Sequence, residues 1–197
     1  MRYGPDHKAE SRQRMLESVG ALAKRDGLEG TGLAALMAAA GVTTGAFYSQ
    51  FKGKAELLQA VAQHELGKML PVFEGGDAGA IAAFLRRYVS LDHVRHPEIG
   101  CPIPTLAAEI GRAGDATRAS FEALVKRLHQ GVASATGDRD TAWTIMAQAA
   151  GAVLLARAMG SDETRLEVLN AAWSALAPLL AVGEGVHSPV VEPQAGR

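Results

Sequence analysis

Residues 31–58 hold the side chains of this sequence whose types and spacing best indicate a chemical role. Apolar residues repeat at i, i+3 and i+4 over residues 33–40, which predicts a short helix. Gly41 follows at the position where a left-handed residue commonly ends a helix. Thr43 or Thr44 can then cap a second short helix, because a threonine hydroxyl accepts a hydrogen bond from a free N–H group. The pattern predicts two helices joined by a tight turn.

The second helix, expected at residues 45–50, has two unlike faces. Phe47 and Phe51 are four residues apart and are predicted to point inward together. The other side is small and polar, and consists of Thr43, Thr44, Gly45, Tyr48 and Gln50. A helix-turn-helix places such a face in the major groove of DNA. Periodicity alone leaves open a helical hairpin that only builds an all-α core.

The same stretch resembles the N-terminal signature of the tetracycline-repressor (TetR) family of bacterial transcriptional regulators. The matching residues are Thr31, Leu36, Ala40, Gly41, Val42, Thr43, Gly45, Phe47, Tyr48, Phe51, Gly53, Lys54 and Leu57. The resemblance is close over residues 8–65 and is one of architecture beyond them. Gly32, Ala34, Met37 and Gln50 depart from the common pattern. These departures leave the operator sequence open.

The resemblance implies a role in DNA binding for individual residues of the stretch. Tyr48 and Lys54 would hold phosphates, and Lys54 opens a helix whose free N–H groups also favour a phosphate oxygen. The small residues before Tyr48 would face base edges, together with Gln50. The predicted DNA-binding residues are Thr31, Thr43, Thr44, Gly45, Tyr48, Gln50 and Lys54.

Composition predicts an all-α fold, because alanine, leucine and glycine dominate and no alternating β-branched run is found. We expect about nine helices. The expected domains are a three-helix helix-turn-helix DNA-binding head at residues 1–53 and a larger helical ligand-binding and dimerisation domain at residues 54–182. Residues 183–197 are rich in Gly and Pro without a period, and are expected to be a disordered tail.

Charge is distributed unevenly along the 197 residues, although the net charge is only −1. Residues 1–54 hold eight Lys/Arg and five acidic residues, a net charge of +3, and the remainder carries −4. A basic N-terminal part on an acidic body supports a DNA-binding head joined to a sensor domain. The sequence shows neither an apolar membrane span nor a signal peptide, so we expect a cytoplasmic protein without a membrane partner.

A broad apolar stripe runs along a helix expected at residues 77–94. In the TetR family this region lines a ligand cavity, although such a stripe can equally be plain core. A loop rich in proline follows, and a further helix is expected from about residue 105. The tentative ligand-binding residues are Phe84, Tyr88, Leu91, Cys101 and Leu106.

Cys101 is the only cysteine and stands just before a predicted helix start, where N–H dipoles can lower the pKa of a thiol. Three interpretations stay open: a buried structural residue, an oxidant-sensing thiol, and a metal ligand with His93 and His96. The spacing fits no firm zinc motif, so no metal or cofactor is predicted. A Cys/His nucleophile would also need an oxyanion site, and no motif for one is found. We therefore predict no catalytic residues and no enzyme.

Two long amphipathic helices are expected at residues 139–159 and 162–180. In the TetR family the last two helices of each subunit form a four-helix dimer interface, and two reading helices per dimer are what recognition of a palindrome requires. An intramolecular hairpin is the alternative. The tentative interface residues are Trp143, Ala147, Ala150, Leu154, Leu166, Leu169 and Trp173.

Together these features predict a ligand-responsive transcriptional regulator. It would bind a palindromic operator in double-stranded DNA as a homodimer, act as a repressor, and be released by an unknown small-molecule inducer. The alternative of the same fold is a regulator that senses oxidants or electrophiles through Cys101. A helical adaptor that binds protein through the same hairpin is a further alternative, which salt dependence would separate from a DNA binder.

Overall fold

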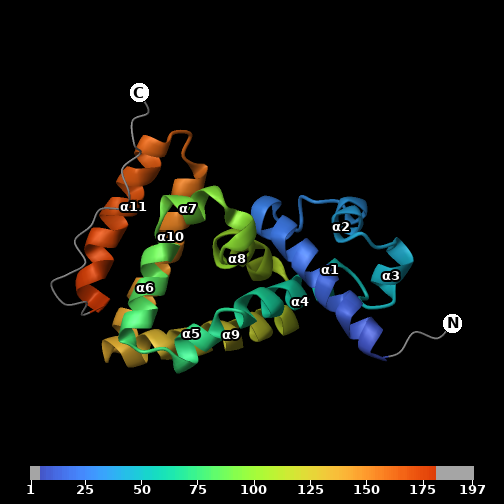
Figure 1. The fold of residues 1–197 in the computed structure, drawn as a ribbon, viewed down its shortest axis with the longest axis horizontal. Coiled ribbons are helices and arrows are strands. Elements are labelled where there is room, and N and C mark those ends of the chain that lie inside the picture. The colour runs from blue at the N-terminus through green and yellow to red at the C-terminus, as the bar shows by residue number, and fades with distance from the viewer. Residues whose placement is uncertain (1–4, 181–197) are drawn as a thin grey trace. The chain divides into compact units, whose positions relative to one another are not determined.

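The computed structural model describes residues 5–180, with only the backbone described for residues 5–9 and 11. Residues 1–4 and the expected tail at residues 183–197 lie outside this range. Within it every regular element is a helix, with eleven α-helices and two short 3₁₀ helices in chain order (Figure 1). The all-α prediction is confirmed for the described part of the chain.

The helices divide into two compact units. The first unit combines the chain up to residue 68 with residues 97–125. Its elements are α1 (Pro5–Asp26), α2 (Leu33–Ala40), α3 (Thr44–Tyr48), α4 (Lys54–Gly67), η1 (Pro97–Ile99), α8 (Ile103–Arg112) and the first half of α9 (Asp115–Thr136). The second unit contains α5 (Leu70–Gly75), α6 (Ala78–Tyr88), α7 (Leu91–Arg95), the rest of α9, α10 (Arg139–Ala158), α11 (Asp162–Leu176) and η2 (Ala177–Leu180). The domain boundaries expected at residues 53 and 182 stay a prediction.

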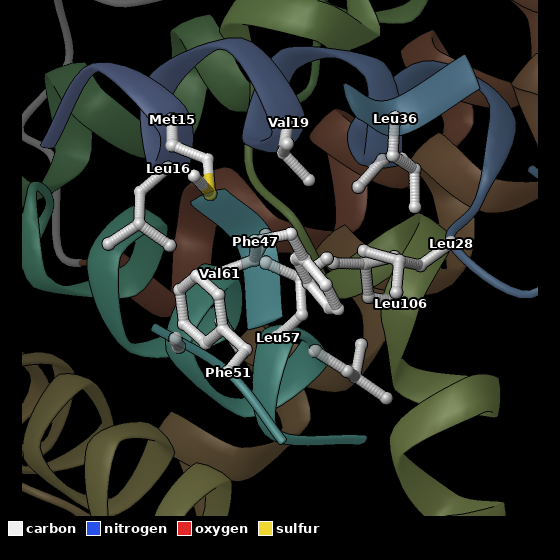
Figure 2. Close-up of a cluster of buried hydrophobic side chains, with 14 of the residues drawn as sticks. Met15, Leu16, Val19, Leu28, Leu36, Phe47, Phe51, Leu57, Val61 and Leu106 are labelled. Carbon is white, nitrogen blue, oxygen red and sulfur yellow. The ribbon is translucent and has the colours of Figure 1, made fainter. Parts of the chain in front are cut away.

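The core of the first unit is built around two phenylalanine rings. Phe47 and Phe51 are fully buried, as their spacing predicts, with ring centroids 5.6 Å apart. Figure 2 shows both rings among apolar side chains from α1 and α4, and Leu106 of α8 belongs to the same cluster. Burying a phenylalanine stabilises a fold by about 1.5–3 kcal/mol. The short α3, which could not form alone, is therefore held by its inward face.

Two of the expected helices are divided differently in the structure, which explains why there are more than nine. The helix expected at residues 77–94 is interrupted, because Val89 leaves helical geometry and the Ser90 hydroxyl accepts from the His93 N–H to begin α7. In the sequence, a proline at position 71 predicts that the helix beginning at Lys54 ends near residue 70. In the structure α4 ends at Gly67, and Pro71 lies in the first turn of a separate helix, α5, where a missing N–H group costs nothing.

In the second unit, α9 approaches α5 at a glycine. A Cβ atom on Gly131 would lie 2.1 Å from the carbonyl oxygen of Phe73, which is backbone and cannot swing away. Helices α9 and α5 can therefore pack this closely only because residue 131 has no side chain. In the same unit α10 and α11 pack side by side as an antiparallel pair (Figure 1).

We expect Gly131→Ala to lower the free energy of unfolding by roughly 1–3 kcal/mol, because the added methyl group must force α9 and α5 apart. Urea unfolding followed by circular dichroism measures this change. Gly111→Ala on α8 is the matched control, since a Cβ atom there meets nothing within 4 Å. It should be neutral or slightly stabilising. Equal stability of the two variants would disprove the steric argument.

Candidate nucleic-acid interface

The turn between α2 and α3 is defined by its hydrogen bonds. Gly41 is left-handed at φ 62°, its N–H donates to the Ala38 carbonyl, and the Val42 N–H donates to the Met37 carbonyl. This pair of bonds is the Schellman motif, which glycine favours because it has no Cβ penalty. Thr43 is extended, and its hydroxyl accepts from the Ala46 N–H at 3.2 Å to begin α3. The expected ends of the first helix are confirmed, and Thr43 rather than Thr44 caps the second. That helix, α3, runs from Thr44 to Tyr48 and so ends two residues before the predicted end at Gln50.

One face of α3 is exposed and small. Thr43, Thr44 and Gly45 lie at the surface, and Tyr48 is 59% exposed. The Tyr48 ring packs edge-on against Phe47, with centroids 5.0 Å apart, so the ring is held while its hydroxyl end faces outward. Four of the predicted DNA-binding residues are thus on one accessible surface above a rigid core.

Of the other three predicted DNA-binding residues, two are hydrogen-bonded within the chain and one is partly buried. The Thr31 hydroxyl donates to the Gly27 carbonyl at 2.8 Å, so a phosphate would have to displace that carbonyl to receive the proton. Gln50 lies beyond the end of α3 and is partly buried. Its side-chain oxygen is buried without a hydrogen-bond partner among the described residues. Lys54 donates from Nζ to the Glu29 carbonyl at 3.2 Å. A lysine has three donors, so this bond leaves two for a ligand.

The positive charge of the head is only partly available. Arg14 and Lys52 are exposed, whereas Arg25 pairs with Asp26 at 2.8 Å. The Arg12 guanidinium lies 4.4 Å from the centroid of the Phe51 ring, which positions it by a cation–π contact. The side chains of Arg12, Arg14 and Lys52 can supply the electrostatic part of binding to phosphates.

The segment that leads from α1 into α2 is held by a carboxylate from α8. Glu109 accepts the Leu28 N–H at 2.9 Å and the Glu29 N–H at 3.1 Å. Its side chain is buried, and Gly27, at φ 77°, leaves the room that it occupies, because a Cβ atom there would lie 2.7 Å from the carboxylate. Thr105 donates to the Lys24 carbonyl at 2.7 Å from the same helix.

The same end of α1 carries a buried ion pair with α4. The Lys24 Nζ lies 2.7 Å from Oε2 of Glu65, and Lys68 binds the other oxygen at 2.7 Å. Both partners of the first pair are only 4% exposed. Burial alone would raise the pKa of Glu65, but the hydrogen bonds from the two lysines outweigh it and hold the pKa below its usual value. The carboxylate therefore stays ionised against α1.

Comparison with known families decides the identity of this fold. Residues 20–61, which include α2, α3 and the turn between them, match the sequence profile of the bacterial regulatory proteins of the tetR family. Residues 20–61 are therefore a tetR-family N-terminal region. No curated protein matches the sequence.

Solved structures of similar fold cover most of this chain. E. coli NemR in its reduced form is 19% identical with a TM-score of 0.70, covering 86% of this chain and 96% of that one. A TetR transcriptional regulator from Chloroflexus aurantiacus is 26% identical, covers 90% and 97%, and has a TM-score of 0.67. The Bacillus subtilis regulator FadR, in complex with stearoyl-CoA, is 14% identical, covers 86% and 98%, and has a TM-score of 0.63. These similarities extend the shared fold from the tetR-family head to the rest of the described chain.

The predicted ligand-binding residues fall into both units. Phe84 and Tyr88 of α6 are neighbours in the second unit, with ring centroids 6.2 Å apart, and the partly buried Leu91 opens α7. Leu106 belongs to the buried cluster of the first unit. Cys101 is also in that unit, 4% exposed, and its Sγ accepts from the Ile103 N–H at 3.4 Å. The burial favours a structural role for the cysteine, and thiol sensing stays a prediction.

The predicted dimer-interface residues differ in how far they are buried. Trp143, Ala147 and Leu154 are exposed on α10, with Ala150 partly buried beside them. The three predicted residues of α11, Leu166, Leu169 and Trp173, are buried within the second unit itself. Their apolar spacing marks a core face of α11, which leaves little of their surface for a partner to cover. Their role in a dimer interface stays a prediction.

In the described part of the chain no group of three or more His, Cys, Asp or Glu residues could hold a metal ion. None of the helices within residues 5–180 is both long and apolar enough to cross a membrane.

Sequence reasoning missed the residues that hold the end of α1. Glu65 and Glu109 each occupy a position on the apolar stripe of their helix. Glu65 lies one helical turn, four residues, after Val61, and Glu109 lies between Leu106 and Ile110. A carboxylate at a core position is a detectable signal, because burial of a charge requires a partner. The local pattern does not identify the partner, which for Glu109 is a backbone segment 80 residues away in the sequence.

His64 makes the stability of this unit depend on pH. Burial, and then the nearby Lys68 ammonium, lower the pKa of His64 below its ordinary value of 6.5, because both disfavour the imidazolium ion. The unfolded chain therefore takes up a proton near pH 6.5 that the folded chain accepts only at lower pH. We expect the free energy of unfolding to fall as the pH drops from about 7 through 6.5 to the folded-state pKa.

The comparison of wild type with His64→Gln isolates this effect. Urea unfolding between pH 7.5 and 4.5 should show a smaller loss of stability for the variant than for the wild type across that window. Parallel curves for the two proteins would mean that His64 does not titrate differently in the folded and unfolded states.

Proposed function

We propose that this tetR-family chain is a ligand-responsive transcriptional regulator that binds a palindromic operator as a homodimer and represses transcription until a small molecule releases it. One observation carries the DNA-binding part: the exposed face of Thr43, Thr44, Gly45 and Tyr48 on a helix-turn-helix whose inner face is fully buried. A second helix of this geometry enters the major groove, and its small residues permit close approach to the bases.

The chemistry of that face supports distinct roles. Threonine hydroxyls hydrogen-bond base edges, and their methyl groups contact the thymine methyl. Tyr48 presents a phenolic hydroxyl that can donate to a phosphate oxygen. Lys54, at the start of α4, adds a charge whose binding to phosphate releases a counterion. Phosphate contacts position the protein, while base contacts specify the sequence.

Two substitutions separate these roles. Tyr48→Phe keeps the ring against Phe47 and removes one hydroxyl, so we expect weaker DNA binding with an unchanged dependence on salt. Lys54→Met removes a charge, so the slope of log affinity against log salt should become shallower by about 1 for each subunit. Fluorescence anisotropy with DNA from the region upstream of the gene, across a salt series, measures both. Wild-type binding that is absent, or insensitive to salt, would overturn the proposal.

A dimer through α10 is supported by its outward face. Leu154 is 53% exposed and Trp143 is 41% exposed, whereas Ile145 and Val153 face inward. Trp143 is also stacked on His129 of α9, with centroids 4.1 Å apart, so its position at the surface is fixed. A two-fold axis beside α10 would pack this outward face of one protomer against the same face of the other. Outward residues of α11, rather than its predicted apolar stripe, would complete the interface.

Leu154→Glu tests this interface. The contact would bury one unpaired carboxylate from each protomer, so we expect dimer dissociation to become easier by roughly 3 kcal/mol or more. Sedimentation velocity across a concentration series measures the change. Ile99→Glu is the matched control, because Ile99 is 76% exposed but lies on η1 in the first unit. A dimer that is unaffected by Leu154→Glu would place the interface elsewhere.

The proposed inducer response is a shift between two conformations. A ligand that binds better to the form with low DNA affinity reduces operator binding by the same differential free energy. In the second unit the aromatic series Phe73, Phe84, Tyr88 and His93, with successive centroids 4.9, 6.2 and 4.6 Å apart, supports an apolar or mixed small molecule. The stearoyl-CoA bound to FadR is a ligand of that kind in a protein of similar fold.

A further inference from the structure

Glu29 is tied to α8 and to α4 at once. Its N–H donates to Oε2 of Glu109 on α8 at 3.1 Å, and its carbonyl accepts from Nζ of Lys54 at the start of α4 at 3.2 Å. Its own carboxylate also pairs with Arg112 of α8 at 2.6 Å. A continuous series of hydrogen bonds therefore runs from α8 through one residue to Lys54.

Glu109 is well suited to fix this residue. Its two oxygens accept the N–H groups of Leu28 and Glu29, which orients two successive peptide planes. Bonds from N–H groups to a carboxylate are shorter and stronger than those between neutral groups. Leu28 is itself buried in the core cluster (Figure 2), so the segment is anchored on its apolar side as well. These bonds hold the Cα of Glu29 in place, and the peptide plane that carries the carbonyl bound by Lys54 begins at that atom.

We propose, on the basis of the proposed DNA-binding function, that Glu109 is a positioning residue for phosphate binding by Lys54. The lysine stem is flexible, and its ammonium group has three donors. One donor held by the Glu29 carbonyl aims the other two, so the phosphate contact requires less ordering of the side chain. Without the bonds from Glu109, the backbone at Glu29 loses its fixed position, and the carbonyl that anchors Lys54 moves with it. Helix α8 thereby controls a DNA contact that it does not make.

The isosteric variant Glu109→Gln tests this role in the full-length protein. The amide keeps one accepting oxygen and replaces the other with an NH₂ group, which cannot accept an N–H. At 0.1 M salt we expect DNA affinity to fall about tenfold and the salt slope to become shallower by about 1 for each subunit, as with Lys54→Met. The double variant should bind like Lys54→Met alone, because both changes remove the same contact.

Ile110→Ala is the control for a purely structural effect. Ile110 is buried next to Glu109 on α8, so its truncation lowers stability but leaves the Glu29 bonds in place. This variant, once shown to be folded, should keep the wild-type salt slope. A wild-type slope for Glu109→Gln, or additive losses with Lys54→Met, would overturn the positioning role alone. Wild-type protein that shows no salt-dependent DNA binding would instead overturn the DNA-binding function, and this proposal with it.

Discussion

The buried ion pair between Lys24 and Glu65 is the constraint on which the first unit depends. Both groups are almost fully removed from water, and loss of either partner would leave an uncompensated charge at a cost of about 3–5 kcal/mol. Sliding of α4 along α1 would separate the two charges, so the pair fixes the register of these helices. A Cβ atom on Gly20 would lie 2.7 Å from Glu65, and the glycine therefore makes room for the carboxylate.

The position of the exposed face of α3 follows from the fixed register of α1 and α4. Phe47 and Phe51 insert among the apolar side chains of α1 and α4, and their burial leaves Tyr48 and the residues before it outside. Helix α8 closes the same end of α1 through Glu109, Thr105 and the peptide groups that they bind. A five-residue helix is presented to solvent in one orientation because everything behind it is packed or hydrogen-bonded.

The parts of this structure that depend on local chemistry could be predicted from the sequence. Gly41 as a left-handed helix end, Thr43 and Asp77 as helix caps, and the inward pair of phenylalanines all follow from residues within one or two turns of each other. The break at Val89 and Ser90 escaped prediction because the apolar stripe of α6 continues past it in sequence, although the helix does not.

The parts that depend on distant partners could not be predicted in the same way. The apolar stripe of α11 indicates a buried face but does not reveal whether its own chain or a second copy covers that face, and Leu169 and Trp173 are covered by their own unit. Likewise, the sequence around Glu109 gives no sign of the backbone N–H groups near residue 28 that its carboxylate binds. Periodicity identifies what is buried, and only the fold identifies the partner.

The central claim is that the exposed face of α3 reads a specific DNA sequence in a dimer. The most direct measurement is selection of genomic fragments by the purified full-length protein, followed by sequencing of the bound DNA. We expect the bound fragments to share one sequence with two-fold symmetry, whose half-sites lie about one helical turn, or roughly 10 base pairs, apart. Bound fragments without any shared sequence would show that the helix-turn-helix of this chain does not read DNA.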